Sequence, residues 1–392
     1  MKKEFVKGIA VGVTASLAVA AGGYAGYRIQ DKGVLSEADH VQKIKALEAL
    51  IQRDYLGEID EDQLAEGLYA GLVSGLGDVY SRYYTAEEYK QENSATMGAY
   101  VGIGVTMQKN KEGGVEIVEC YEGGPADHAG VKAGDIISDI DGTDITDMDV
   151  SDVADMIREG NKKQAVLTIH RQNVENPMKI TVEITDVTLP SVFEEMLPDQ
   201  IGYIRISEFT DVTPDQFSEA FSSLEEQGMK KLVVDLRGNP GGLLSSVCSI
   251  LNEILPEGLI VYTEDKYGER QEQKSEGKTP LEIPLAVLVN ENSASASEIF
   301  AGAVQDHGIG TIVGTTTYGK GVVQELLPLR DGSAIKLTIS NYYTPKGNSI
   351  NETGIKPDVE VKLDPDLLNQ EEISHEEDNQ LQEALKVLAK EK

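Results

Sequence analysis

The sequence predicts an α/β protein in which a core of alternating strands and helices is joined to a separate β-rich unit. Across residues 189–362, apolar runs typical of buried strands alternate with helical patterns, which is the order found in α/β folds. Across residues 98–188, short β-type runs are separated by glycine turns instead. A helical region, residues 31–97, precedes both, so several structural units are expected.

Length and composition narrow the class of protein. A chain of 392 residues predicts two or three domains, and 40% apolar with 26% charged residues indicates a globular chain. The 35 Lys and Arg against 67 Asp and Glu give a net charge of −32. This balance argues against a nucleic-acid partner, because phosphate binding depends on clustered cations. With only Cys120 and Cys248 and five scattered histidines, we expect no disulfide scaffold and no metal.

Residues 1–30 have the pattern of an export segment. Three lysines lie within the first seven residues, and residues 8–27 carry no charge. Twenty helical residues span about 30 Å, the thickness of the hydrocarbon core of a bilayer. We favour an uncleaved signal anchor over a cleaved signal peptide, because the apolar run continues past the weak cleavage motif Ala18-Val19-Ala20. A buried core helix is disfavoured by the lack of a polar face. The body of the chain is then expected outside the cytoplasm, either on a single-pass membrane anchor or secreted.

Two further segments predict helices with an apolar stripe. In residues 31–97, apolar side chains recur every three or four positions, for example at Val41, Ile44 and Leu47. The acidic tail, residues 363–392, ends in a short helix suited to packing on a neighbour. Stripes of this kind are typical of a core or of a dimer seam, so a homodimer is one expectation. No chemistry is visible in residues 31–97.

The β-rich unit begins with the small-residue run Gly102-Ile103-Gly104-Val105. Small residues allow successive backbone N–H groups to converge on a carboxylate, while the adjoining strand edge pairs with an extended peptide. The order of strands and turns in residues 98–188 resembles a PDZ domain, with this run at the carboxylate-binding loop. A β-domain with ordinary glycine turns is the alternative. A dinucleotide site is disfavoured, because the third glycine of its fingerprint is missing.

The first candidate for chemistry is the stretch NENSASASE, residues 290–298, between an apolar strand and a helix. Ser295 and Glu298 have the spacing of a capping box, so Ser295 is a helix cap in the simplest interpretation. A serine at this position also has helix-terminal N–H groups beside it. Such groups stabilise the oxyanion that forms when a serine attacks a carbonyl.

The second and third candidates are glycine-rich turns. DLRGNPGG, residues 235–242, is either a tight connection or a turn that points a backbone N–H into a cleft. GTTTYGKGVVQ, residues 314–324, approaches a phosphate-binding loop, but Gly321 stands where Ser or Thr is needed for magnesium. Lys320 is either a solvated loop lysine or an amine inserted into a cleft. Burial there would lower its pKa and make it a general base for a serine.

Taken together, DLRGNPGG, NSASASEIFAGA, YGKGVVQ and YYTPKGNSINETGIKPD resemble the carboxyl-terminal processing peptidases, also called tail-specific proteases. The resemblance covers nearly the whole chain beyond the membrane segment. It implies a crotonase/ClpP-like α/β protease core with an inserted PDZ domain. By position in these motifs it implies Ser295 as nucleophile, Lys320 as general base and Gln324 as the residue that orients the lysine. Gly241 and Ala296 would supply the oxyanion N–H groups.

The resemblance also implies a serine endopeptidase without metal or organic cofactor. Its substrates would be proteins or peptides with apolar C-termini, bound by the PDZ unit. Two alternatives remain, a catalytically silent tail-binding scaffold and, less favoured, a P-loop ATPase. Gly242 competes with Gly241 as oxyanion donor, and we favour Gly241. Four residues of straight strand span about 13 Å, so Gln324 reaches Lys320 only if the chain bends at Gly321.

Overall fold

The computed structural model describes residues 33–368, 370 and 373–390, apart from 112, 122 and 159–161. The chain divides into two compact units, Met1–Tyr69 and Ala70–Lys392. The predicted export segment, residues 1–30, lies outside the described residues. Among the described ones, no helix combines the length and the apolar character that crossing a membrane requires.

The first unit contains the short η1 (Val34–Ser36) and the helix α2 (Ala38–Asp54). The helix α3 (Glu61–Ser74) crosses the boundary between the units. Both helices form where the apolar spacing predicts them. No residue of α2 is buried, and Leu47 and Leu50 remain about half exposed.

The core of the second unit is a six-stranded sheet with the order β10-β11-β12-β15-β16-β19. Only β10 and β11 are antiparallel, and the other neighbours are parallel. The central strands are short apolar runs with both faces covered, which is typical of parallel sheets. In β15 all five residues are buried. The strands are β10 (Val192–Leu197), β11 (Ile201–Ile206), β12 (Lys231–Asp235), β15 (Leu285–Val289), β16 (Thr311–Gly314) and β19 (Val359–Glu360).

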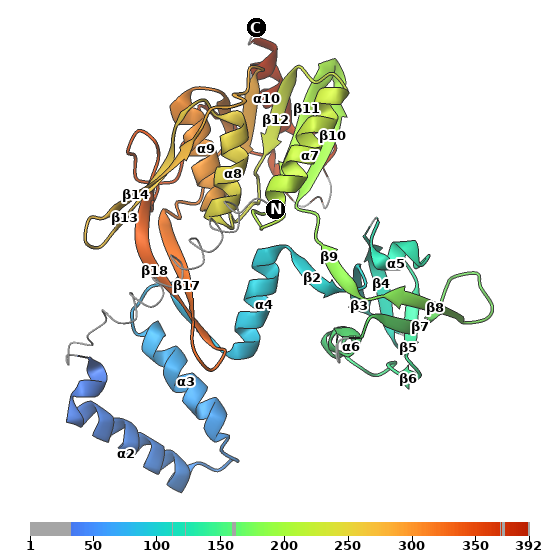
Figure 1. Ribbon diagram of the computed structural model, residues 1–392, viewed down its shortest axis with the longest axis vertical. Helices are drawn as coiled ribbons and strands as arrows, with labels where there is room; N and C mark the ends of the chain where they lie inside the picture. Colours follow the sequence, from blue (N-terminus) through green and yellow to red (C-terminus); the bar gives the residue numbers. More distant parts are fainter. Residues whose placement is uncertain are drawn as a thin grey trace, which may run out of the picture. The chain divides into compact units, whose positions relative to one another are not determined.

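Three helices cover one face of this sheet (Figure 1). They are α7 (Thr213–Glu226), α8 (Leu244–Ile254) and α9 (Ala296–His307), and their apolar side chains share one core with alternate residues of the strands. Because side chains alternate between the two faces of a strand, the remaining strand residues point to the opposite face.

The C-terminal helix α10 (Asn379–Lys390) covers that opposite face. Leu381, Ala384 and Leu388 are fully buried and share a cluster with sheet residues that include Val233 and Leu288. A buried leucine of this kind contributes about 2 kcal/mol. The surface on which this helix packs is therefore the chain's own sheet, which covers its apolar stripe.

A second, antiparallel sheet carries the hairpin β17 (Val322–Pro328) and β18 (Ala334–Tyr343). The strands β1 (Arg82–Tyr84) and β13 (Gly258–Asp265) pair with β18, and β14 (Arg270–Ser275) pairs with β13. The helix α4 (Ala86–Met97) follows β1. The segment between β16 and β17 contains Lys320, so this lysine lies where the chain passes from one sheet to the other.

The β-rich unit has its own core, formed by a five-strand path and two helices. It is connected to the rest of the chain through a ribbon of β2 (Ala99–Gly102) and β9 (Thr185–Thr188), which are antiparallel neighbours. Its other elements are β3 (Val105–Lys109), β4 (Val115–Cys120), α5 (Pro125–His128), β5 (Ile136–Ile140), β6 (Thr143–Asp144), α6 (Val150–Arg158), β7 (Gln164–His170) and β8 (Met178–Glu183).

Candidate active site

Ser295 occupies a sharp turn between β15 and α9, where it is the N-cap residue of the helix. Its backbone has φ 55° and ψ −112°, a conformation that residues with a side chain rarely adopt. The amide of Ala296, the first helical residue, forms no hydrogen bond with any described residue. A partly exposed hydroxyl is thus held beside an unpaired amide at a helix N-terminus, where the helix dipole favours negative charge.

Glu298 lies three residues further along, in the first turn of α9, and is fully buried. Its Oε2 accepts the N–H of Ser295 at 2.8 Å, so the predicted capping box is present. The same carboxylate accepts three hydrogen bonds from the segment before β17: Thr317 Oγ at 2.6 Å, Gly319 N at 2.7 Å and Lys320 N at 2.9 Å. Burial raises the pKa of Glu298, and these donors oppose that effect.

The glycine turn after β12 approaches Ser295 closely. A Cβ on Gly241 would lie 2.7 Å from Ser295 Cβ, and one on Gly242 would lie 2.1 Å from the carbonyl oxygen of Phe209. Their φ angles are 108° and 134°. Only glycine fits both the space and the backbone conformation.

The two glycines differ in the state of their amides. Gly241 donates its N–H to Oδ1 of the buried Asn239 at 2.8 Å. The N–H of Gly242 has no hydrogen-bond partner within the part of the chain that the structure describes. In this conformation Gly242 therefore has the available amide, and Gly241 becomes available only if Asn239 releases it.

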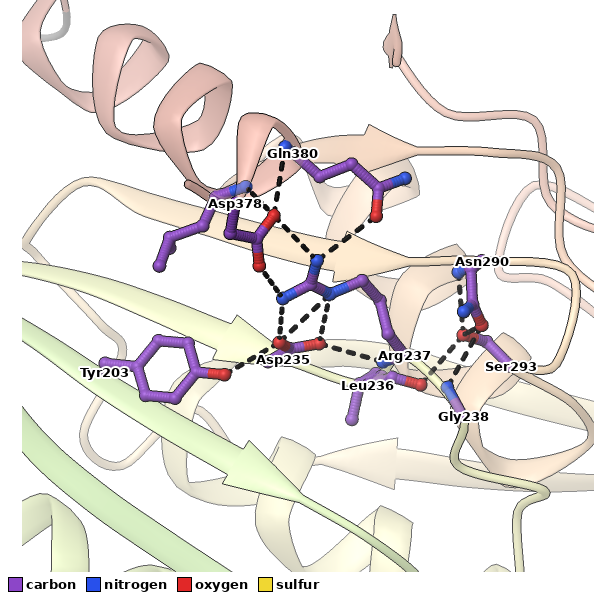
Figure 2. Close-up of polar contacts among 10 residues, drawn as sticks. Tyr203, Asp235, Leu236, Arg237, Gly238, Asn290, Ser293, Asp378 and Gln380 are labelled. Atoms are coloured by element: carbon purple, nitrogen blue, oxygen red, sulfur yellow. Dashed lines mark hydrogen bonds and ion pairs between the residues drawn. The ribbon is translucent and has the colours of Figure 1, made fainter. Parts of the chain in front are cut away.

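A buried ionic network surrounds Arg237 at the start of the glycine turn (Figure 2). Arg237 Nη2 lies 2.6 Å from Asp235 Oδ2 and 2.7 Å from Asp378 Oδ2. Tyr203 donates its hydroxyl to Asp235 at 2.7 Å. Arg237 Nη1 also bonds Gln380 at 3.1 Å. The start of α10 is thus tied to the turn that contains the candidate oxyanion donors.

Lys320 extends from the loop before β17 and is partly buried. Burial lowers its pKa, and the neighbouring cation Lys336 lowers it further, while Glu298, Glu92 and Asp78 oppose the shift. Its ammonium lies over the ring of Tyr80, 5.0 Å from the centroid. Tyr342 donates its buried hydroxyl to the carbonyl oxygen of Lys320 and also interacts with the Ser295 side chain.

Gln324 lies on β17, directly after a break in the register between Val323 and Gln324. Its Nε2 bonds Thr338 Oγ1 at 3.3 Å and the carbonyl oxygen of Val322 at 3.4 Å. Neither bond reaches Lys320. The two residues are brought to the same cavity but are not in contact through a hydrogen bond among the described residues.

A single cavity of about 480 Å³ brings the candidate residues together. Serine, lysine, glutamine and the glycine turn all contribute to its lining. Among the described residues, no hydrogen bond joins Ser295 Oγ to Lys320 Nζ. The rest of the lining combines apolar side chains such as Leu243, Ile299 and Val322 with the charged side chains of Glu92, Glu208 and Lys336.

In the β-rich unit, the small-residue run forms a tight loop between β2 and β3. Ile103 and Val105 are buried, and Gly104 has φ 80°. The phenol of Tyr100 lies near this loop, since the backbone amides of Gly104 and Val105 act to lower its pKa. Burial raises the pKa of Tyr100, and these donors oppose the shift. The expected carboxylate-binding amides therefore have the phenol of Tyr100 nearby.

Sequence reasoning missed several residues around the cavity. The sequence pattern marks Glu298 only as part of a capping box, although an acid within an otherwise apolar helix segment indicates a buried role. Lys336 and Glu92, which form an ion pair at 2.6 Å, lie 244 positions apart and gave no local signal. Tyr342 stands in the quoted motif YYTPKG, but nothing in its spacing indicated contact with Lys320.

Comparison with known families identifies three regions of the chain. Residues 200–361 match the model of peptidase family S41, residues 116–171 match a PDZ domain, and residues 18–88 match the N-terminal domain of the activating protease CtpB. The S41 match contains all three candidate catalytic side chains. The PDZ match lies within the β-rich unit.

Individual relatives cover most of the chain. It is 33% identical over 314 residues to the carboxy-terminal processing protease CtpA of Bacillus subtilis, which is 80% of this chain and 67% of that protein. It is also 33% identical over 329 residues to a probable CtpA-like serine protease of Staphylococcus aureus, covering 83% and 66%. A putative S41 protease structure from Bacteroides fragilis has the same fold, with TM-score 0.50 and 19% identity over 88% of this chain and 97% of that one.

The fold, the cavity and these matches define a serine peptidase of family S41 that carries a PDZ domain. Within that class, the chain belongs to the carboxy-terminal processing proteases.

Proposed function

We propose that the chain is an endopeptidase in which Ser295 and Lys320 perform the chemistry and the PDZ domain selects substrates by their C-terminal tails. The observation that carries the proposal is that both side chains line one cavity together with a glycine turn and a helix N-terminus. Serine attack on a carbonyl needs a base, an oxyanion site and room for a peptide, and this cavity contains groups suited to each task.

The reaction follows from these groups. Lys320 in its neutral form accepts the proton of the Ser295 hydroxyl as Oγ attacks the peptide carbonyl. The oxyanion is stabilised by the amide of Ala296 and by Gly241 or Gly242. Lys320 then returns the proton to the departing amine, and water releases the acyl group from Ser295 by the same route.

Lys320 must move for this reaction. Its ammonium now lies over Tyr80, and Gln324 is bonded to Thr338 and Val322. We propose that substrate binding moves Lys320 from Tyr80 towards Ser295, where Gln324 orients it. The flexible four-carbon stem of Lys320 allows this movement while the backbone of the residue stays in place.

The PDZ domain would take a C-terminal carboxylate at the loop Gly102-Ile103-Gly104-Val105. The carboxylate would compete there with the phenol of Tyr100, which lies near the amides of Gly104 and Val105. The apolar surroundings, with Ile103 and Val105 buried, favour an apolar terminal residue.

The location and the assembly of the protein are also proposals. The lysines and the uncharged run within residues 1–30 support a signal anchor with the catalytic body outside the cytoplasm.

The exposed apolar side chains of α2, such as Leu47 and Leu50, support a homodimer through that helix. Replacing both leucines with Lys should then convert a dimer to a monomer in light scattering.

The central experiment compares the chain lacking residues 1–30 with its Ser295→Ala variant. Each is incubated with an unfolded protein that ends in apolar residues, and the products are identified by mass spectrometry. We expect cleavage by the unsubstituted chain alone, with tail binding retained by both. Equal product from both chains would exclude Ser295 as the nucleophile. Tail binding without cleavage by either would support the silent scaffold.

A further inference from the structure

The carboxylate of Glu298 joins two segments that the proposed reaction needs at a fixed separation. One is the serine turn between β15 and α9, and the other is the lysine loop between β16 and β17. The carboxylate receives the Ser295 N–H at 2.8 Å on Oε2 and the Lys320 N–H at 2.9 Å on the same oxygen. One carboxylate oxygen therefore bridges the backbones of the two candidate catalytic residues.

The other oxygen completes the contact with the lysine loop. Oε1 accepts Gly319 N–H at 2.7 Å and Thr317 Oγ at 2.6 Å. Thr317 Oγ itself accepts the N–H of Ile355 at 2.6 Å, so its hydrogen is free to point to Glu298. All four partners of Glu298 are donors.

Only an ionised carboxylate satisfies such a set. It is an acceptor only, with about four lone-pair sites, whereas an amide or a protonated acid places a hydrogen against at least one donor. The side chain is fully buried, and burying a charge is unfavourable unless it is fully paired. Helix capping does not explain the arrangement, because capping uses only the bond to Ser295 and glutamine performs it equally well.

We propose that Glu298 is a positioning residue of the peptidase reaction, which sets the separation of Ser295 and Lys320 by bonding both backbones through one buried carboxylate. The proposal rests on the proposed function. Glu298 does not touch substrate. It fixes the backbone positions from which the Ser295 hydroxyl and the Lys320 amine extend. A displacement of about 1 Å between reacting groups costs on the order of 10²-fold in rate.

The negative charge of Glu298 has a second effect, on the pKa of Lys320, which can be measured separately from positioning. The groups that act on Lys320 come from several elements: Lys336 on β18 lowers its pKa, while Glu298 on α9, Glu92 on α4 and Asp78 before β1 raise it. The ring of Tyr80 also faces the ammonium. Removing the charge of Glu298 should lower the pKa of Lys320, so the acid limb of the pH–rate profile should move to lower pH.

The test is Glu298→Gln in the full chain, solubilised in detergent and assayed beside the unsubstituted chain and Ser295→Ala. We expect kcat per folded protein to fall about 10- to 100-fold, with KM changed less than about twofold, and the acid limb to move to lower pH. The protein should still fold, because the glutamine keeps the capping bond and the Tyr318 N–H still bonds the Ser293 carbonyl at 3.0 Å.

Glu88 offers a matched control. At the start of α4 it accepts the N–H of Thr85 at 3.0 Å, and Thr85 Oγ1 accepts the N–H of Glu88, but the carboxylate of Glu88 is partly exposed and lies in another helix. Glu88→Gln makes the same chemical change in a capping box whose carboxylate also pairs with the exposed Arg82. It should leave kcat, KM and the acid limb unchanged.

The outcomes separate the two proposals. If the unsubstituted chain cleaves and Glu298→Gln matches it in kcat and in the acid limb, the positioning role is wrong and the peptidase remains. A lower yield of folded protein with normal kcat and an unmoved acid limb would likewise reduce Glu298 to a structural residue. If the unsubstituted chain does not cleave, the proposed function itself fails. Should Glu298→Gln not fold, Glu298→Asp decides: it keeps the charge but is one methylene too short to bridge, so full activity overturns the proposal.

Discussion

Arg237 and Asp378 lie 141 positions apart in the sequence, and their side chains form a buried ion pair with Nη2 and Oδ2 separated by 2.7 Å. Arg237 follows β12 and leads into the glycine turn, while Asp378 directly precedes α10 (Figure 2). Asp378 also accepts the amides of Gln380 and Leu381 at 3.0 Å, so it begins the helix as well as pairing with the arginine. The C-terminal helix is therefore part of the support of the candidate site.

We expect Asp378→Ala to lower the free energy of unfolding by about 3–5 kcal/mol, because it leaves the buried Arg237 with one carboxylate fewer and removes the cap of α10. Urea denaturation followed by circular dichroism measures the change. Lys386→Ala is the control in the same helix, since its pair with Glu383 is exposed and should change the value by less than about 1 kcal/mol. A loss below 1 kcal/mol in Asp378→Ala would show that the network does not stabilise the fold.

The pH dependence of cleavage should follow the pKa of Lys320. Burial and the cation Lys336 lower this pKa, so the neutral amine is available below the usual titration range of lysine. Lys336→Met removes the cation and frees the anion of Glu92, and both changes raise the pKa of Lys320. The acid limb of the rate profile should then move to higher pH, as measured with a fluorogenic peptide. A limb that stays in place, or moves to lower pH, would contradict Lys320 as the base.

Two glycine-to-alanine substitutions test whether the glycine turn contributes to catalysis. Gly241→Ala places a Cβ 2.7 Å from Ser295 Cβ and from the Ala294 carbonyl oxygen, so the turn must shift away from Ser295. We expect kcat to fall on the order of 10²-fold through loss of oxyanion stabilisation. Gly238→Ala is the control, because its Cβ would meet nothing within 4 Å. It should cost about 1 kcal/mol of stability, from its φ of 74°, with kcat nearly unchanged. Equal losses of kcat in the two variants would show that the position of Gly241 beside Ser295 has no specific role in catalysis.

The backbone of Ser295 predicts a difference between two inactive variants. Its φ of 55° and ψ of −112° suit glycine better than alanine. Ser295→Gly should therefore be more stable than Ser295→Ala by about 1 kcal/mol in urea denaturation, although neither cleaves. The reverse order of stability would show that the turn is not strained.

Tyr100 predicts a gain of binding. Tyr100→Phe removes the phenol oxygen that faces the amides of Gly104 and Val105, so a peptide carboxylate no longer competes with it. In a Ser295→Ala background, we expect a peptide with an apolar C-terminus to bind up to about tenfold more tightly in fluorescence anisotropy. The same peptide with an amidated C-terminus should not gain affinity. An unchanged dissociation constant would show that the peptide carboxylate does not bind at the amides of Gly104 and Val105.

The order of strands and helices could be predicted from the sequence because it depends on local patterns. Apolar runs such as those of β12 and β15, bounded by polar or turn-forming residues, indicate buried strands without knowledge of their neighbours. The family and the candidate residues came from motifs, and the structure brings Ser295, Lys320 and Gln324 to one cavity.

What the sequence could not predict depends on contacts between distant segments. The apolar stripe of α10 indicated a partner surface, but periodicity does not say whether that surface belongs to another chain or to the chain's own sheet. The hydrogen bonds of Glu298 also depend on distant segments. Three of the four come from residues 19–22 positions away, in the loop before β17. A capping-box pattern contains only the fourth.

The ribbon of β2 and β9 has a consequence for how this protein can vary. Ala99 is paired with Thr188 and Gly102 with Thr185, so the chain enters and leaves the PDZ domain at adjacent points. Insertions with neighbouring ends are well tolerated by the host fold. Residues 103–184 could therefore be replaced as a unit. A short turn, or a domain that recognises a different peptide end, could be joined to the same two strands without a change in the candidate active site.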